Sequence, residues 1–341
     1  MLRNWLYYRV KPFFPASTRL SVRRWFALRK RPRVDGVWPI LPGSERPPQD
    51  WRGWPDGKRF AFVITHDVEG QEGMDKCREL MEVELKLGFR SSFNFVPEGA
   101  YSVCPEVLGM LRQNGFEIAV HDLNHDGRLF DSRRSFALKA NKINQHIKKW
   151  GAIGFRSGFM LRKLEWLHDL NILYDSSTFD TDPFEPQPDG AGTIFPFWVP
   201  CSGPPSQSGI EIRELSGASQ RRGYVELPYT LPQDSTLFLL LRERSIDIWR
   251  RKLAWIAANG GMALVNVHPD YISFNGDRGS PFRFPVHHYE ELLQHVKRDY
   301  EHQCWHALPR EAAFLHSANH FPKNPTLDCS LRCSTLPKTK C

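Results

Sequence analysis

The chain has 341 residues, of which 41% are hydrophobic and 13% aromatic, enough to bury the core of one enzyme-sized domain. Residues 1–33 carry ten basic residues and no acid, and the rest of the chain carries 36 bases and 38 acids. The net charge of +8 therefore belongs to the leader, which argues against a specific nucleic-acid partner for the body. Seven scattered cysteines exclude the dense, even framework of a small secreted domain and favour a reducing compartment.

Residues 1–33 mix aromatic side chains with arginines and prolines, which interrupt any run long enough for a signal peptide or a membrane span. We expect a cytoplasmic protein. The leader itself has three interpretations: a loosely packed, solvated arm, a peripheral contact with anionic lipid at the inner face of the membrane, or a nucleic-acid contact.

A stretch rich in Pro, Gly and Trp follows, so we assign residues 1–58 to the arm and an irregular approach. From residue 59, apolar runs alternate with helical patterns, which predicts a parallel α/β sheet with helical crossovers. The expected strands are Phe60–Thr65, Ser91–Val96, Phe116–Val120, Ile153–Arg156, Leu173–Tyr174 and Met262–Val267. The expected helices are Lys76–Leu87, Pro105–Gln113, Phe136–Trp150 and one around Leu161–Leu170.

The pattern lapses between residues 181 and 234, where nine prolines indicate a Pro/Gly-rich insertion. Long loops of this kind often shape a substrate cleft. Trp198 and Tyr224 lie in it, and we favour a core position for both over stacking on a ligand. The catalytic domain is expected to span residues 59–316, with an irregular tail over 317–341.

Asp67 and Glu69 follow the first expected strand, two residues apart. In an extended backbone their side chains point to one face and Val68 to the other. Two such carboxylates can have different roles: one binds and is neutralised by a cation, and the other acts as a general base. A solvated acidic turn is the alternative for this pair alone.

His121 and His125 follow the third expected strand, at the sheet edge where binding groups of parallel folds collect. In a single helical turn, both imidazoles reach one metal ion. The spacing alone decides little, because His302/His306 and His316/His320 share it without a comparable strand before them. We expect those two pairs to be surface or packing features, and we do not expect His316, His320, Cys329 and Cys333 to form a structural zinc site.

Three more strand ends carry ionisable residues, namely Arg156, Asp175 and His268. A buried arginine near Asp67 keeps that carboxylate ionised, and an aspartate beside His268 raises the imidazole pKa so that it acts as an acid. Each of these three residues alone could equally form a structural ion pair. Together with the two strand ends that carry the acids and the histidines, however, five strand ends carry ionisable residues, and this indicates a site.

The ordered set Thr65–Glu69, His121–His125, Arg156, Asp175 and His268 resembles the five motifs of the polysaccharide deacetylases, carbohydrate esterase family four. The resemblance covers roughly residues 59–310. It implies an incomplete (β/α) barrel of about seven strands and a divalent ion, most plausibly zinc, held by Glu69, His121 and His125. It also implies Asp67 as the catalytic base, Arg156 as its orienting partner, and His268, paired with Asp175, as the general acid.

The chain departs from the family pattern at the first motif, where Val68 separates two acids that are commonly adjacent and His66 replaces a common aromatic. Arg156 also lacks the usual following proline. Asp67 as the metal ligand thus stays an alternative to Glu69. The resemblance implies N-deacetylation of a glycan or glycan precursor in surface polysaccharide biosynthesis. The alternatives are hydrolysis of a small non-sugar amide, or a catalytically silent glycan-binding protein.

Overall fold

The computed structural model describes residues 14–49, 51–201, 223–274 and 280–320. The α-helices are α2 (Ala16–Lys30), α3 (Gln71–Leu87), α4 (Pro105–Gln113), α5 (Arg133–Trp150), α6 (Asp247–Asn259), α7 (His287–Tyr300) and α8 (Pro309–His320). The strands are β1 (Phe60–Val68), β2 (Ser92–Phe95), β3 (Glu117–His121), β4 (Gly154–Arg156), β5 (Tyr174–Asp175), β6 (Phe197–Pro200), β7 (Gly223–Glu226), β8 (Met262–Asn266), β9 (Ile272–Ser273), β10 (Phe284–Pro285) and β11 (Cys304–Ala307).

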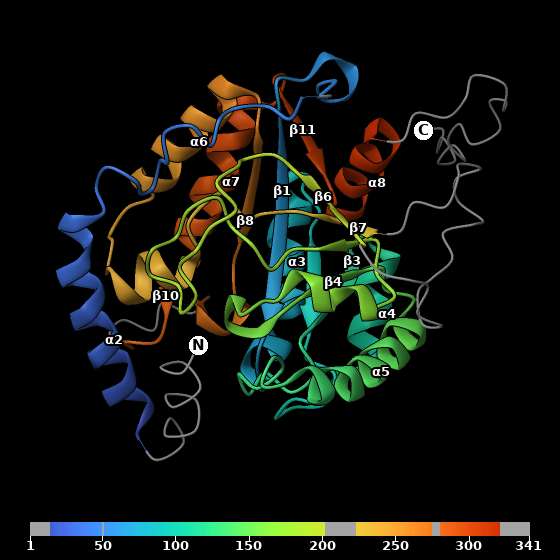
Figure 1. The fold of residues 1–341 in the computed structure, drawn as a ribbon. Coiled ribbons are helices and arrows are strands. Elements are labelled where there is room, and N and C mark those ends of the chain that lie inside the picture. Colours follow the sequence, from blue (N-terminus) through green and yellow to red (C-terminus); the bar gives the residue numbers. More distant parts are fainter. Residues whose placement is uncertain (1–13, 50, 202–222, 275–279, 321–341) are drawn as a thin grey trace, which may run out of the picture.

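The main sheet curls around the centre of the molecule, with the helices packed outside it (Figure 1). Its parallel strands run in the order β8-β1-β2-β3-β4-β5-β7, β11 pairs with the first half of β1, and β6 is antiparallel to β7. Between β7 and β8 the barrel is closed only by loop contacts, in which the amides of Thr230 and Leu231 donate to the carbonyl of Leu264. The prediction of an incomplete barrel of about seven strands is confirmed.

Strand β1 has two different faces, although all nine of its residues are buried. Phe62, Ile64 and Val68 belong to the core between the sheet and the helices. Ala61 and Val63 belong to a second apolar cluster inside the barrel, which also holds Ala312 and Ala313 of α8. Helix α8 contacts β1, β5, β6, β7 and β11, and it therefore fills the amino end of the barrel. The polar residues of β1 lie at its other end, the carboxyl end, where they can form a site.

Two predictions of secondary structure need correction. The segment around Leu161–Leu170 forms the short 3₁₀ helices η4 (Gly158–Met160) and η5 (Leu164–Asp169) in place of an α-helix. The Pro/Gly-rich insertion also contributes to the sheet, because β6 and β7 both lie within it. Their few residues and flanking glycines and prolines hid these strands from pattern analysis.

The leader is more ordered than a solvated arm over residues 16–33, where α2 and the 3₁₀ helix η2 (Arg31–Arg33) form. The Arg24 Nε donates to the Leu239 carbonyl at 2.7 Å, and Arg31 forms an ion pair with Glu243. In the approach segment, Trp38 and Trp54 are buried, and Trp54 Nε1 donates to the Gly260 carbonyl. These contacts attach the leader to the barrel.

Helix α8 continues to His320, beyond the residue at which the sequence places the start of the tail. Cys77, Cys104, Cys201 and Cys304, the cysteines within the described ranges, are all free thiols. Among those same residues, no helix has both the length and the apolar character that a membrane crossing requires.

Candidate metal centre and active site

Asp67 and Glu69 turn to the same side of the strand, as the sequence predicts. Asp67 Oδ2 and Glu69 Oε1 lie 3.9 and 3.8 Å from the same atom, Nε2 of His268. Val68 between them packs into the core on the opposite side. The inner row of β1 thus changes from Ala61 and Val63 to carboxylates as it reaches the open end of the barrel.

His121 is the last residue of β3, and His125 follows in a loop. The predicted helical turn is wrong: Asp122 and His125 both adopt left-handed backbone conformations, with φ of 57° and 54°. The Asp122 carboxylate accepts hydrogen bonds from the amides of Leu123 and Gly158, which fixes this strained loop. The two imidazoles converge because of this turn, with ring centroids 4.9 Å apart.

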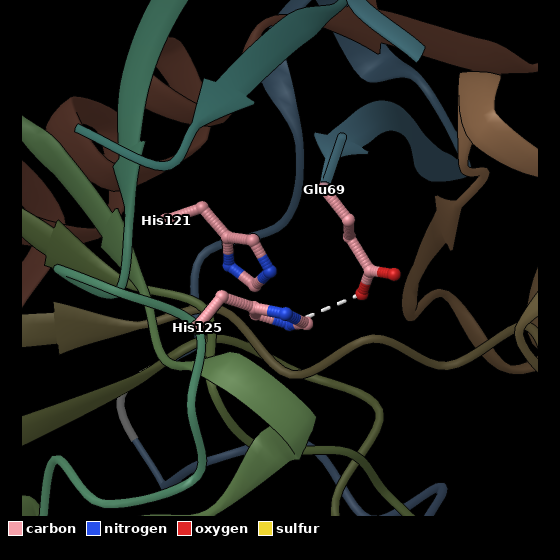
Figure 2. A group of neighbouring side chains, drawn as sticks. All are labelled: Glu69, His121 and His125. Atoms are coloured by element: carbon pink, nitrogen blue, oxygen red, sulfur yellow. Dashed lines mark ion pairs between the residues drawn. The ribbon is translucent and has the colours of Figure 1, made fainter. Parts of the chain in front are cut away.

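Glu69, His121 and His125 point toward one another in Figure 2, and one ligand atom from each lies within 4.8 Å of the others. His125 Nε2 is 3.1 Å from Glu69 Oε1. His121 Nδ1 bonds to the carbonyl of Arg156 at 3.1 Å, so its Nε2 carries the lone pair. That Nε2 is buried and has no hydrogen-bond partner in the described chain. Two imidazoles and a carboxylate in this arrangement fit a divalent metal ion.

Glu69 is held by two residues of the short 3₁₀ helix η7 (Pro269–Tyr271), which follows β8. Tyr271 donates its hydroxyl to Glu69 Oε2 at 2.6 Å, and the Glu69 amide donates to Asp270 at 2.8 Å. Burial alone raises the pKa of Glu69, but His125 and the other histidines outweigh it and lower that pKa well below its usual range. Glu69 is therefore ionised, as a metal ligand must be.

Asp67 has different partners. Its Oδ1 accepts from Asn94 at 2.7 Å and from Arg156 at 3.3 Å, and its Oδ2 accepts from Asn266 at 2.8 Å. Burial raises the pKa of Asp67, but the charges of Arg156 and His268, with the hydrogen bond from Asn94, lower that pKa below its ordinary value. The sequence predicted the contact with Arg156. That arginine is fully buried and also donates to Ser176.

The partner predicted for His268 is wrong. Asp234 holds this imidazole: its Oδ1 lies 2.6 Å from Nδ1, and its Oδ2 accepts from the backbone amide of His268 at 2.7 Å. Burial by itself lowers the pKa of His268, but Asp234, with Glu69 and Asp67, raises it to about 10. The ring is thus a cation at neutral pH, with Nε2 directed at the two carboxylates.

Asp175 occupies a separate, fully buried position on β5. Its carboxylate accepts from the hydroxyl of Ser177 at 2.6 Å and shares a hydrogen bond with Glu226, and burial is the main cause of its raised pKa. Asp175 therefore supports the strand end behind Arg156 instead of contacting His268.

The sequence missed three residues of the site. Asn94 pairs with Asp67 across the β1–β2 ladder, and Asn266 pairs with Thr65 across the β1–β8 ladder. Asn94 lies between Phe93 and Phe95, and Asn266 lies between Val265 and Val267. A polar residue between large apolar neighbours is a signal that sequence analysis can use. Asp234, at the end of the insertion, carries no comparable signal.

The sequence also predicted the positions of several residues outside the site. The ring of His306 contacts backbone groups of Phe62 and Arg90, so the packing role predicted for it is confirmed. Tyr224 is buried, so its predicted core position is confirmed, and Trp198 is half-buried against the edge of the inner cluster. Cys329, Cys333 and the side chain of His320 lie outside the described residues.

Comparison with known proteins finds similarity at the level of structure. No family model matches the chain, and no curated protein does. A protein from Mycobacterium smegmatis classed as a polysaccharide deacetylase superposes with a TM-score of 0.57 at 17% identity, covering 82% of this chain and 97% of its own.

Weaker likenesses are found to two further structures. The Xyl-CE4 domain of a xylanase from a Trinervitermes trinervoides hindgut metagenome has a TM-score of 0.41 at 11% identity, over 76% of this chain and 91% of its own. The peptidoglycan deacetylase PdaC from Bacillus subtilis has a TM-score of 0.40 at 12% identity, over 78% of this chain and 96% of its own. The first likeness identifies the fold: this chain has the fold of the polysaccharide deacetylase superfamily.

Proposed function

We propose that this protein is a metal-dependent N-deacetylase acting on an N-acetylated glycan or glycan precursor. One observation carries the proposal: a carboxylate with no share in the metal cluster, Asp67, and a protonated imidazole, His268, both border the group Glu69, His121 and His125. A base, an acid and three metal ligands in one place are the groups that amide hydrolysis requires.

The ligand set favours zinc, which binds His nitrogens and carboxylate oxygens and leaves a position open in catalytic sites. A bound divalent ion supplies Lewis acidity, lowering the pKa of water and polarising a carbonyl group. Glu69, His121 and His125 hold the ion. The bond from His121 to the Arg156 carbonyl fixes the ring so that Nε2 faces it.

The chain's own residues then move the protons. Asp67, ionised and fixed by Arg156, Asn94 and Asn266, takes a proton from the attacking water. The C–N bond of the acetamide breaks when His268 gives its Nε2 proton to the leaving nitrogen. The products are a free amino sugar and acetate. Asp234 stabilises the cation of His268 until that step.

The substrate class rests on the fold and on these groups. A barrel of this kind serves several amides, so a small non-sugar amide is the second candidate, and a silent glycan-binding protein is the third. The third is disfavoured by the full set of ionisable groups in the site. We place the glycan reaction in surface polysaccharide biosynthesis.

The deciding experiment measures acetate released by the full-length protein from N-acetylglucosamine oligomers and from small cyclic amides. We expect release from the oligomers, its loss on chelation, and its return with zinc or cobalt. The Asp67→Asn protein serves as the matched negative control. Turnover of the cyclic amides alone contradicts a glycan substrate, and a metal-free, inactive protein supports the third candidate.

We also propose a location. The exposed side of α2 carries Val22, Trp25 and Phe26 among arginines, the composition of a segment that lies on anionic lipid. A cytoplasmic enzyme held at the inner face of the membrane in this way meets glycan precursors where surface polysaccharides are assembled.

A further inference from the structure

A pocket of about 490 Å³ lies away from the metal centre, between α2, the amino end of α7 and the segment after the π-helix η6 (Ser235–Leu240). This volume is within the range of small-ligand sites. Its charged lining consists of four arginines and one glutamate, namely Arg24, Arg242, Arg244, Arg283 and Glu243. Arg31 forms an ion pair with that glutamate, so the pocket has a strong positive excess.

The positive charges are crowded in the pocket. Burial, followed by the nearby charge of Arg242, lowers the pKa of Arg24. Arg24 cannot turn away, because its guanidinium donates to the carbonyls of Leu239 and Pro281. Arg242 is held with a left-handed backbone φ of 59°, which is uncommon for a residue with a long side chain. An anion bound here relieves the repulsion.

The first turn of α7 adds donors to the same wall, because His287 and His288 begin this 14-residue helix and both line the pocket. The residue before them, Val286, supplies no side-chain cap. Helix amino ends with free N–H groups bind anions, since those groups and the helix dipole both favour negative charge.

His288 gives an independent indication of a ligand. It is only 7% exposed, it stacks on Phe238 with the ring planes 10° apart, and its Nδ1 has no hydrogen-bond partner in the described chain. A buried polar nitrogen without a partner costs free energy unless something bonds to it. Burial, then the neighbouring His287, lowers the pKa of His288 to about 4. The ring is thus neutral at pH 7, and its Nδ1 can carry a proton and donate it.

We propose that this pocket binds a phosphate or diphosphate group. Arginine forks match phosphate oxygens in geometry and charge, and a helix amino end and a neutral imidazole donor complete the set. The group has two possible sources, a soluble diphosphate such as that of an activated sugar, or the headgroup of an anionic phospholipid.

The pocket is connected to the candidate active site through two neighbouring segments. Arg283 lines the pocket and also binds Glu72 at 2.6 Å in the first turn of α3, close after Glu69. Strand β10, which also lines the pocket, pairs with β9, the strand directly after Tyr271, the hydroxyl donor to Glu69. The phosphate proposal itself does not depend on the deacetylase activity.

The test uses the full-length protein in titration calorimetry with pyrophosphate, and in sedimentation with phosphatidylcholine vesicles with and without phosphatidic acid. The variant is Arg242→Asn with Arg244→Ser: both side chains are exposed, and Asn tolerates the left-handed backbone. The matched control, Arg128→Asn with Arg134→Ser, removes the same charge from exposed sites outside the pocket.

We expect saturable pyrophosphate binding that weakens about tenfold or more in the pocket variant, as expected for loss of charged hydrogen bonds, and stays unchanged in the control. His288→Phe, which retains an aromatic ring over Phe238, should also weaken it. Vesicle binding that falls in parallel identifies a lipid headgroup as the source, and pyrophosphate binding alone identifies a soluble ligand. Absence of binding to both probes, or equal losses in pocket and control variants, overturns the proposal.

Discussion

Asp67 and Glu69 have the same charge and are separated by one residue, but they have different partners, which support the different roles that we propose for them. Both oxygens of Asp67 accept hydrogen bonds from neighbouring strands. Glu69 lies with His121 and His125, and the hydroxyl of Tyr271 supports it from behind. A base must be oriented and ionised, and a ligand must face the ion. The geometry therefore favours Asp67 as the base and Glu69 as the ligand.

This division predicts different metal contents for three variants. Asp67→Asn should keep its metal and lose turnover by about 10²–10⁴-fold, the usual contribution of a general base. Glu69→Gln should bind metal more weakly, and His121→Ala should lose it. Metal analysis of the purified proteins, beside acetate release, checks all three. Loss of metal from Asp67→Asn alone would reverse the two roles.

The pairing of His268 with Asp234 predicts the pH dependence. The raised pKa keeps the imidazole protonated at neutral pH, and this cation is lost only as the pH rises toward about 10. The charge of His268 also contributes to the free energy of folding. This contribution is complete below the ordinary histidine pKa and is lost as the pH rises through the raised pKa of His268. In Asp234→Asn the anion is gone, so the pKa of His268 should fall by about 1–3 units.

The measurement is the alkaline limb of kcat against pH, which should move to lower pH in Asp234→Asn. Asp175→Asn is the matched control, because Asp175 bonds to Ser177 and Glu226 and makes no contact with His268. If Asp175→Asn moves the limb and Asp234→Asn does not, the partner assignment is incorrect.

At the scale of elements, the sequence predicted best what lies on the strands. The alternation along β1 placed Asp67 and Glu69 on one face, and the parallel order placed His121, Arg156 and His268 at the same end. These contacts follow from strand direction and from a side-chain period of two, which are visible in a sequence.

The contacts missed by the sequence come from loops. Asp234 reaches His268 only because the segment after β7 closes the barrel against β8, a long-range event without a local pattern. The left-handed turns at Asp122 and His125 are likewise set by contacts with β4 and the loop after it. Pairing Asp175 with His268 was wrong for this reason: both are at strand ends, but the insertion provides the nearer acid.

His66 connects four elements behind the site. It lies on the outer face of β1, where its Nδ1 contacts the Val267 carbonyl at 2.9 Å and its Nε2 bonds to Glu84 of α3. Tyr289 of α7 donates to the same carboxylate at 2.6 Å. Both ring nitrogens face oxygen atoms, and the contact at Nε2 joins the ring to the buried carboxyl group of Glu84. This pair fixes the backbone that precedes His268.

Replacing His66 with Phe, an aromatic common at this position in the family it resembles, should destabilise the protein. The ring space stays filled, but the fully buried Glu84 loses the imidazole that bonds to its carboxyl group, which typically costs about 1–3 kcal/mol. Denaturant unfolding gives the free energy directly. The double variant His66→Phe with Glu84→Gln should recover part of the loss. A single variant as stable as the wild type would show that the pair contributes nothing to stability.

At the scale of the whole molecule, the net positive charge belongs to residues 1–33, and the rest of the chain is nearly neutral. Helix α2 lies at the edge of the molecule (Figure 1), with Leu20, Arg24 and Ala27 turned inward. Val22, Trp25 and Phe26 are between 48 and 62% exposed on the other side. An aromatic face among arginines lowers its free energy by entering the headgroup region of anionic lipid.

We therefore predict that Trp25→Ser with Phe26→Ser will reduce sedimentation with anionic vesicles several-fold and spare acetate release from soluble oligomers. The aromatic rings supply the apolar contact, and the inward contacts of α2 are untouched. Leu138→Ser with Phe314→Ser is the control, since both side chains are exposed on helices outside α2. Added salt should weaken the wild-type binding, because the arginines attract the lipid charge. Equal sedimentation of the wild type, the Trp25/Phe26 variant and the control would show that the exposed rings of α2 do not contact the membrane.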